Sequence, residues 1–187
     1  MTKYTLFPRT AFGRDDAMIN QIGSATLAER PDFAIASVAA RAGQGDLSPV
    51  LTGAAAVAVS EWQDGLGRTV FWSGPNQWFV LADHGGSETL AAELKSELGN
   101  QASVTEQNDG WVVFDLQGAD VTPILERLCP INLAEFGTNR VQRTVIDHVG
   151  CFVLCLEPGR SYRLLCGRSF ASSFAHGIKT IMGSVAV

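Results

Sequence analysis

The sequence is poor in charged residues and has no long apolar run. Charged residues make up 18% of its 187 residues and hydrophobic residues 46%, a balance that excludes intrinsic disorder. Stretches without a polar side chain are short, as in Ala54–Val59, whereas a membrane-spanning helix needs about 20 apolar residues. The first residues also lack an apolar stretch of signal-peptide length. We therefore expect a cytoplasmic protein without a membrane span.

Basic residues are also scarce in the middle of the chain. The formal net charge of −5 argues against broad binding to nucleic acid or to anionic membranes. Residues 61–120 hold ten acidic and two basic residues, whereas residues 121–187 hold four acidic and seven basic ones. This asymmetry indicates either surfaces that face different partners or a solvated acidic face.

The common catalytic and nucleotide-binding motifs are missing. No G-x-G-x-x-G opens a helix, and neither a Walker lysine motif nor a G-x-S-x-G elbow occurs. Two alternatives stay open at this stage. A cysteine could act together with His148 or His176, and Asp115, an acid in an apolar strand, could serve as a general base or be a satisfied strand residue. The pattern favours a chain with no catalytic residue.

The four cysteines show no paired C-x-x-C spacing, which favours reduced thiols in a core. A zinc site is the alternative, with Cys151 and Cys155 as ligands and His148 as the third. Alternation along a continuous strand puts both cysteines on one face and His148 on the other. The sequence therefore predicts no metal site in this chain.

Turn residues divide the apolar segments into hairpins. A hairpin is expected around Ser73–Asn76, from residues 68–72 to 78–81. A second hairpin is expected around Asn108–Gly110, from residues 103–106 to 111–116. Residues 54–59 are either the end of a short helix or a strand. Further strands are expected at residues 33–39, 141–149, 151–156 and 162–166.

Three helices are expected after these hairpins and strands. Ser87 is a candidate N-cap for a helix with Leu90, Leu94 and Leu98 on one face and Gly99 as its stop. The other two carry the apolar stripes Val121, Leu125 and Leu128, and, after a Ser169 cap, Phe170, Phe174, Ile178 and Ile181.

This order favours an α+β fold with antiparallel or mixed sheets and helices packed on one face. We expect an N-terminal arm over residues 1–30 and an α+β region over residues 31–187, with candidate sub-lobes at 31–107 and 108–187.

Tryptophan and arginine provide the candidate contacts with a partner. Trp72 and Trp78 are either core residues or interface anchors. The arginines of the C-terminal part can grip carboxylates of a partner or ligand, or pair with acids of this chain. The interface candidates are Trp72, Trp78, Arg143 and Arg168, and the arginine series also includes Arg140 and Arg163.

An ordered set of short blocks resembles the gamma subunit family of heterotetrameric sarcosine oxidase. The resemblance spans about residues 26–185, and it is the ordered set of blocks, which ends in the run Gly167–Phe174, that is specific. The other blocks are residues 36–41, 72–78, Gly118–Asp120, Ile124–Leu125, Cys129–Leu133, Phe136–Gly137, Arg143–Thr144 and Val149.

The resemblance implies a fold like the folate-binding region of the glycine-cleavage aminomethyltransferase, and a role inside an assembly. Such an assembly demethylates sarcosine to glycine, forms hydrogen peroxide and passes the one-carbon unit to tetrahydrofolate. The family places FAD, FMN, NAD, zinc and the folate site in the alpha, beta and delta partner subunits, and no cofactor or catalytic residue in gamma. The alternative is a stand-alone folate-binding module whose C-terminal arginines hold the carboxylates of the folate.

Overall fold

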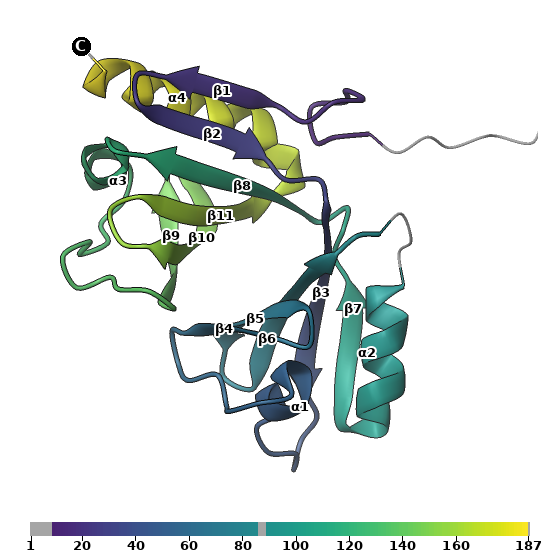
Figure 1. The fold of residues 1–187 in the computed structure, drawn as a ribbon. Coiled ribbons are helices and arrows are strands. Elements are labelled where there is room, and N and C mark those ends of the chain that lie inside the picture. Colours follow the sequence, from purple (N-terminus) through teal and green to yellow (C-terminus); the bar gives the residue numbers. More distant parts are fainter. Residues whose placement is uncertain (1–8, 86–88, 187) are drawn as a thin grey trace, which may run out of the picture.

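The described residues form two β-sheets, and each sheet is covered by helices on one face (Figure 1). The structure, a computed structural model, describes residues 9–85 and 89–186. All strand pairs within the two sheets are antiparallel. The predicted α+β class, with helices packed on one face, is confirmed.

One sheet has six strands, in the order β1-β2-β8-β11-β10-β9. Its two faces follow the alternation along each strand. In β10, Cys151 and Val153 belong to the core under the helices, whereas Phe152 and Leu154 belong to the core between the sheets. The strands are β1 (Ile19–Ile22), β2 (Ala25–Glu29), β8 (Trp111–Gly118), β9 (Val141–Ile146), β10 (Val149–Glu157) and β11 (Ser161–Gly167).

The other sheet has five strands, in the order β4-β5-β6-β3-β7. The predicted hairpin around Ser73–Asn76 joins β5 to β6 and places Trp72 opposite Trp78. A shorter hairpin, which the sequence analysis did not predict, joins β4 to β5. The strands are β3 (Phe33–Ala40), β4 (Trp62–Gly65), β5 (Arg68–Gly74), β6 (Gln77–Asp83) and β7 (Ala102–Glu106).

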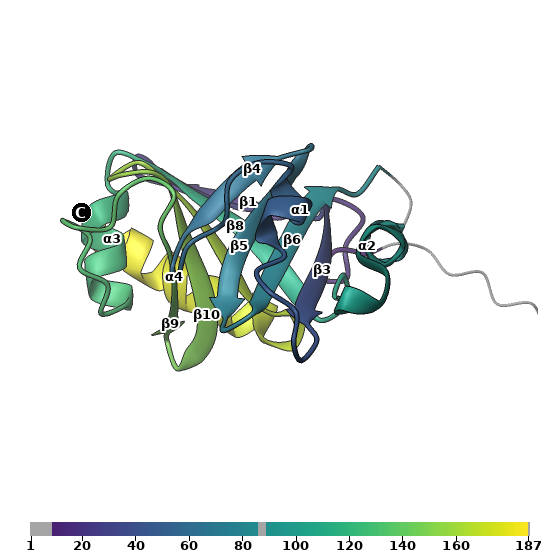
Figure 2. The same cartoon turned by 90° about the horizontal axis from the view of Figure 1, so that it is seen from below.

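The helices cover the outer face of each sheet, because their apolar stripes need a partner. Helix α2 (Leu90–Leu98) buries Leu90, Leu94 and Leu98 against the five-stranded sheet, beside the short α1 (Ser48–Thr52). Figure 2 shows α3 and α2 at opposite ends of the molecule. Helices α3 (Val121–Leu128) and α4 (Ala171–Val185) pack on the six-stranded sheet. The chain also has two short 3-10 turns, η1 (Gly99–Gln101) and η2 (Arg168–Phe170).

Helix ends differ in detail from the expected caps. The expected N-cap Ser87 lies outside the described residues, whereas Gly99 does end α2 with a φ of 54°. Ser169 lies in η2, so α4 begins only at Ala171. Residues 54–59 form neither helix nor strand.

A third core fills the space between the two sheets. It is rich in aromatic rings, and Phe71 stacks on Phe79 at 5.3 Å between centroids with an angle of 7° between the planes. Phe152 reaches across from β10 to within 5.3 Å of Phe71. The molecule is therefore built as four layers, with a helical layer, two sheets packed on each other and a second helical layer.

The five-stranded part is inserted into the six-stranded part. Residues 33–106 build the five-stranded lobe, and residues 9–30 and 111–186 build the six-stranded lobe. Within the described chain, the backbone passes between the lobes only at Arg30–Asp32 and at Gln107–Gly110. The candidate sub-lobe boundary at 107/108 falls in the second of these segments.

The expected N-terminal arm is wrong for residues 9–30. Strands β1 and β2 lie in this segment, and β2 pairs with β8 over five positions. The buried Glu29 carboxylate also accepts the backbone N–H of Ala11 at 2.7 Å and of Met18 at 3.1 Å. The partner strand of β2 follows more than eighty residues later, so local periodicity does not reveal these contacts.

Two other sequence expectations need correction. The hairpin around Asn108–Gly110 does not exist, because β7 pairs with β3 and β8 pairs with β2 and β11, in different sheets. The single strand expected over residues 141–149 is divided by a turn at Asp147 and His148, both in the left-handed region. Asp tolerates that conformation better than most residues.

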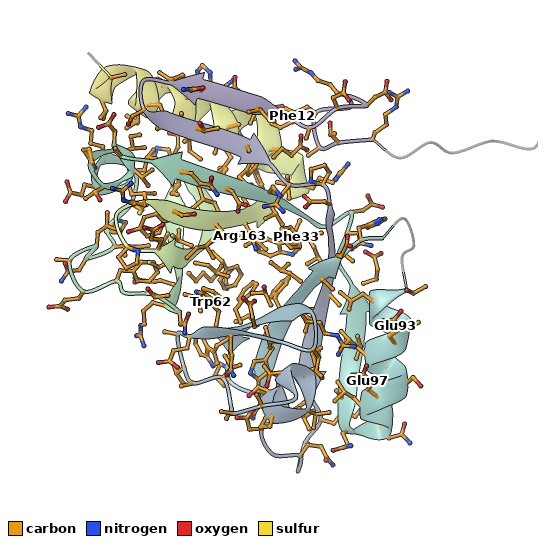
Figure 3. All side chains as sticks on the ribbon, in the orientation of Figure 1. Phe12, Phe33, Trp62, Glu93, Glu97 and Arg163 are labelled. Atoms are coloured by element: carbon orange, nitrogen blue, oxygen red, sulfur yellow. The ribbon has the colours of Figure 1, made fainter. Side chains whose placement is uncertain are left out.

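The two lobes also touch at the edge far from the crossings. The Ser60 carbonyl accepts the Val141 N–H at 2.9 Å, and the Trp62 N–H donates to the Asn139 carbonyl at 2.8 Å. The Trp62 indole donates to the Cys155 carbonyl at 3.0 Å, so this ring lies between the sheets (Figure 3). None of the described helices is long and apolar enough to span a membrane.

The first prediction concerns Gly118, at the end of β8. Its φ is 139°, and a Cβ there would lie 2.1 Å from the Ser24 carbonyl oxygen. We expect Gly118→Ala to lower the free energy of unfolding by about 3 kcal/mol, because backbone must move to admit the methyl group. The matched control is Gly150→Ala in β10, where the space is open and a change within about 0.5 kcal/mol is expected. Equal urea midpoints for the two variants would contradict this account.

Candidate functional site

The candidate site lies where the two crossing segments run side by side. The Gln107 N–H donates to the Ile35 carbonyl at 2.8 Å, and the Ile35 N–H donates to Asn108 Oδ1 at 2.6 Å. The Arg30 N–H donates to the Val113 carbonyl at 2.9 Å. These bonds fix the start of β3 against both the second crossing and β8.

A buried ion cluster lies directly beside these crossings. Asp115 of β8 is only 3% exposed and faces Arg163 in the register of β8 and β11. Arg163 binds the carboxylate in a bidentate manner: Nε donates to Oδ1 at 2.8 Å and Nη2 donates to Oδ2 at 3.0 Å. Arg30 of the first crossing donates through Nη1 to the same Oδ2. One carboxylate therefore holds two arginines from separate segments.

The ring of Phe33 lies next to Arg163 (Figure 3) and also contacts the guanidinium of Arg30. Its centroid is 4.3 Å from Cζ of Arg163 and 4.8 Å from Cζ of Arg30, within the range of cation–π attraction. Arg30 also binds the Asp32 carboxylate through two bonds of 2.9 and 2.6 Å. This hydrogen bonding raises the pKa of Arg30 and holds the pKa of Asp32 below its ordinary value.

This geometry distinguishes the two interpretations of Asp115, as a general base or as a satisfied strand residue. Both of its oxygens accept charge-assisted hydrogen bonds from arginine, so neither is free to take a proton from a substrate. The satisfied-residue interpretation fits and the general-base interpretation does not. The sequence signal was present, since Asp115 and Arg163 are each the one charged residue inside an apolar strand stretch, but their pairing was missed.

A cleft of about 260 Å³ opens beside this cluster, between the lobes. The half-buried rings of Phe33 and Trp111 form its apolar wall. Its polar lining comprises three acids, three arginines and three neutral polar side chains: Asp15, Glu29, Asp109, Arg9, Arg30, Arg168, Thr10, His84 and Asn108. Arg168 Nη2 donates to the Arg9 carbonyl at 2.7 Å, and no carboxylate pairs with Arg168 within the described part of the chain. The cleft combines aromatic surface with a guanidinium, which suits a planar ligand that carries a carboxylate.

The cysteines do not take part in this cleft. All four are buried and free, and all belong to the core between the six-stranded sheet and its helices. Burial raises the pKa of Cys151 and of Cys166 to about 12, and it also raises the pKa of Cys129 and Cys155. At neutral pH these thiols are protonated, so they are poor nucleophiles and poor metal ligands.

The histidines lie apart from the thiols. His148 is exposed in the β9–β10 turn, and His176 is exposed on α4. No group of three His, Cys, Asp or Glu residues suited to a metal ion occurs in residues 9–85 and 89–186. The proposed combinations of cysteine with His148 or His176 are therefore not brought together.

The two tryptophan candidates lie on the helix-covered side of the five-stranded sheet. Trp78 is 3% exposed, and its Nε1 has no hydrogen-bond partner among the described residues. Trp72, on the neighbouring strand, is half-buried and packs on the same core. Trp78 could contact a partner only by leaving this core, so of the two tryptophans Trp72 is the better candidate for an interface anchor.

The arginine candidates do not gather at one place. Arg143 is exposed on the edge strand β9, with its Cζ 5.8 Å from the centroid of Phe152. Arg168 lies at the cleft. Of the remaining series, Arg163 is buried on Asp115 and Arg140 pairs with Glu61 at 3.3 Å. The intramolecular interpretation therefore holds for Arg140 and Arg163, whose partners are Glu61 and Asp115.

The second prediction tests the ion cluster. We expect Asp115→Asn to lower the free energy of unfolding by about 3–5 kcal/mol, because two arginines then lose their buried counter-charge. The control is Arg140→Gln, which breaks the Arg140–Glu61 pair between two half-exposed side chains and should cost about 1 kcal/mol or less. Chemical denaturation monitored by tryptophan fluorescence measures both. A loss of similar size in the two variants would contradict the assigned difference in burial.

The third prediction concerns thiol reactivity. A cysteine-directed alkylating reagent at pH 7.5 should label none of the four cysteines in the native protein within minutes, and all four in urea. Intact-mass spectrometry counts the labels. Rapid single labelling of the folded chain would overturn the assignment of all four thiols to the core and would revive the possibility of a thiol enzyme.

Comparison with known proteins finds a similar fold in two enzymes. The chain is 24% identical to a chain of heterotetrameric sarcosine oxidase from Corynebacterium sp. U-96, solved in complex with pyrrole 2-carboxylate. The superposition has a TM-score of 0.75 and covers 90% of this chain and 89% of that one. No family model and no curated protein sequence matches the chain.

The second similar structure is the glycine cleavage system aminomethyltransferase T from Bartonella henselae. It is 15% identical, with a TM-score of 0.65, over 84% of this chain and 46% of that one. This chain thus corresponds to about half of the aminomethyltransferase. The predicted resemblance is confirmed as a likeness of fold: the chain has the aminomethyltransferase-like fold, which also occurs in heterotetrameric sarcosine oxidase.

Proposed function

We propose that this chain is a non-catalytic gamma subunit of heterotetrameric sarcosine oxidase. Its role is to hold larger subunits in place while they demethylate sarcosine to glycine, form hydrogen peroxide and transfer the one-carbon unit to tetrahydrofolate. The observation that carries the proposal is the end-to-end match in fold with one chain of such an enzyme, at 90% and 89% coverage.

The state of the reactive groups supports a non-catalytic role. The four thiols are protonated and buried. The two buried strand carboxylates are also occupied, Asp115 by Arg30 and Arg163 and Glu29 by the backbone N–H groups of Ala11 and Met18. Groups that are already satisfied by their own chain stabilise the fold but have no capacity left for a substrate. Bond making then belongs to the partners.

The proposal assigns the cofactors to those partners. FAD, FMN, NAD, zinc and tetrahydrofolate bind the alpha, beta and delta subunits of a cytoplasmic assembly, and none binds this chain. Permanent complexes of this type bury about 2,000–5,000 Å² in total through largely apolar interfaces. The low share of charged residues, 18%, suits such a surface.

The fourth prediction is a reconstitution. Coexpressed with the alpha, beta and delta chains of the same organism, this chain should co-elute with them in size-exclusion chromatography at equal stoichiometry. The isolated chain should produce no hydrogen peroxide from sarcosine. A chain that stays monomeric beside the other three, or that oxidises sarcosine unaided, would overturn the proposal.

The cleft favours a second candidate, a stand-alone folate-binding module of one-carbon metabolism. Its aromatic wall suits a flat heterocycle, and the guanidinium of Arg168, which no carboxylate of the described residues engages, suits a glutamate tail. The structure selects the arginine to test, since Arg168 lines the cleft whereas Arg143 lies on β9.

Calorimetric titration with tetrahydrofolate under anaerobic conditions separates the two functions. Micromolar binding to the isolated chain that is lost in Arg168→Ala and kept in Arg143→Ala would favour the folate module. Absence of saturable binding, together with co-elution with the other subunits, would support the subunit role and contradict the folate module.

A further inference from the structure

An apolar surface lies at the β4 edge of the five-stranded lobe. The chain from Gly53 to Val59 contains only Gly, Ala and Val, and every residue in it except Val57 is exposed. Val50 in the middle of α1 is 47% exposed, and Leu66 at the tip of the β4–β5 hairpin is 65% exposed. Folding of this chain buries none of these side chains well.

Leu66 and Gly53 bring the hairpin tip and the helix end together. A Cβ placed on Gly53 would lie 2.8 Å from Cγ of Leu66, so the leucine packs flat on the backbone that follows α1. Thr52 secures the same corner, because its hydroxyl accepts the Ala54 N–H at 3.1 Å and donates to the Ala55 carbonyl at 3.2 Å. We call the surface formed by Val50, Ala54–Ala56 and Leu66 the apolar patch.

The conformation of Leu66 is costly for the isolated chain. Leu66 and Gly67 both have positive φ, 53° and 72°, and such two-residue hairpin turns favour Asn-Gly. A leucine at this position destabilises the isolated chain in two ways, because its backbone is strained and its apolar side chain stays in water. Local folding therefore favours Asn at this position, and leucine is useful only if something covers it.

The charges around the patch indicate what covers it. From residue 42 to residue 67 the chain has three acids and no Lys, Arg or His, and Arg68, which follows directly, is paired with Glu97. Asp46 is bonded to Ser48, Glu61 pairs with Arg140, and Asp64 is exposed on β4. A second copy of this chain would bring like charges together across the patch, and an anionic membrane would be repelled. Complementarity points to a different protein with basic residues around an apolar face.

We propose that the apolar patch is the surface through which this chain docks on one of the larger subunits, with Leu66 as its central anchor. The partner presents an apolar face bordered by Lys or Arg near Asp64. This inference rests on the proposed function, because it takes the occupant to be a sarcosine oxidase subunit.

The fifth prediction separates docking from folding. Leu66→Asn should leave the thermal midpoint of the isolated chain unchanged or raise it, because Asn suits the turn better. The same change should weaken association with the coexpressed alpha, beta and delta chains by about ten-fold or more, since a buried anchor is lost. Asp64→Lys should weaken it as well, more strongly at low salt than at high salt. The matched control is Ile19→Asn, which removes an apolar side chain that is 70% exposed on β1 of the other lobe.

Each outcome decides between the claims. Weaker association in Leu66→Asn with unchanged association in Ile19→Asn supports the patch. Normal association of Leu66→Asn, or equal weakening in both variants, overturns the patch and leaves the subunit role intact. If wild type binds none of the three chains, both proposals fail, and a Leu66-dependent homodimer in light scattering would assign the patch to a second copy instead.

Discussion

The Asp115 carboxylate connects three segments of the chain that are remote in sequence. It receives hydrogen bonds from Arg163 on the neighbouring strand and from Arg30 in the first crossing, and both arginines lie against Phe33 at the start of β3. Apolar packing between two sheets is not directional. A carboxylate bound by a guanidinium through two hydrogen bonds is directional, so this cluster fixes the start of the first crossing on the six-stranded sheet and, through Phe33, the start of β3 beside it.

The placement of the two lobes shapes the cleft and the proposed apolar patch. The cleft exists because the crossings, the start of β3 and Arg168 are held next to one another at the junction. The opposite edge is closed by the contacts of Ser60 and Trp62 with the segment before β9. With both edges fixed, the five-stranded lobe presents its apolar patch in a constant position relative to the six-stranded lobe. The role proposed for this chain, to hold larger subunits in place, needs this rigidity.

Much of the fold could be predicted from local pattern. The spacing of Leu90, Leu94 and Leu98 and the turn between Trp72 and Trp78 each involve residues close in sequence, and both were confirmed. The α+β class and the likeness to sarcosine oxidase followed from element order and from short blocks. The residues that define the site did not follow, because Arg30, Asp115 and Arg163 meet only through strand pairing across long separations.

The errors have the same origin. Residues 19–29 alternate weakly and were interpreted as an arm, since their partner strand β8 comes after the whole five-stranded lobe. Asn108–Gly110 has ideal hairpin chemistry, yet the strands beside it join different sheets. Leu66-Gly67 forms a tight turn, but leucine is not typical of such turns, so the sequence does not indicate it. A turn motif reports that the chain reverses or bends locally, but not which strands become neighbours.

The insertion of one lobe within the other has a consequence for the order of folding. Ala28 pairs with Asp115 across 87 positions, a long loop whose closure costs entropy. Residues 33–106 have their own sheet and core, and their ends lie side by side once they fold. The inner lobe then shortens that loop to a few residues, so β1 and β2, although synthesised first, join their sheet only after the middle of the chain has assembled.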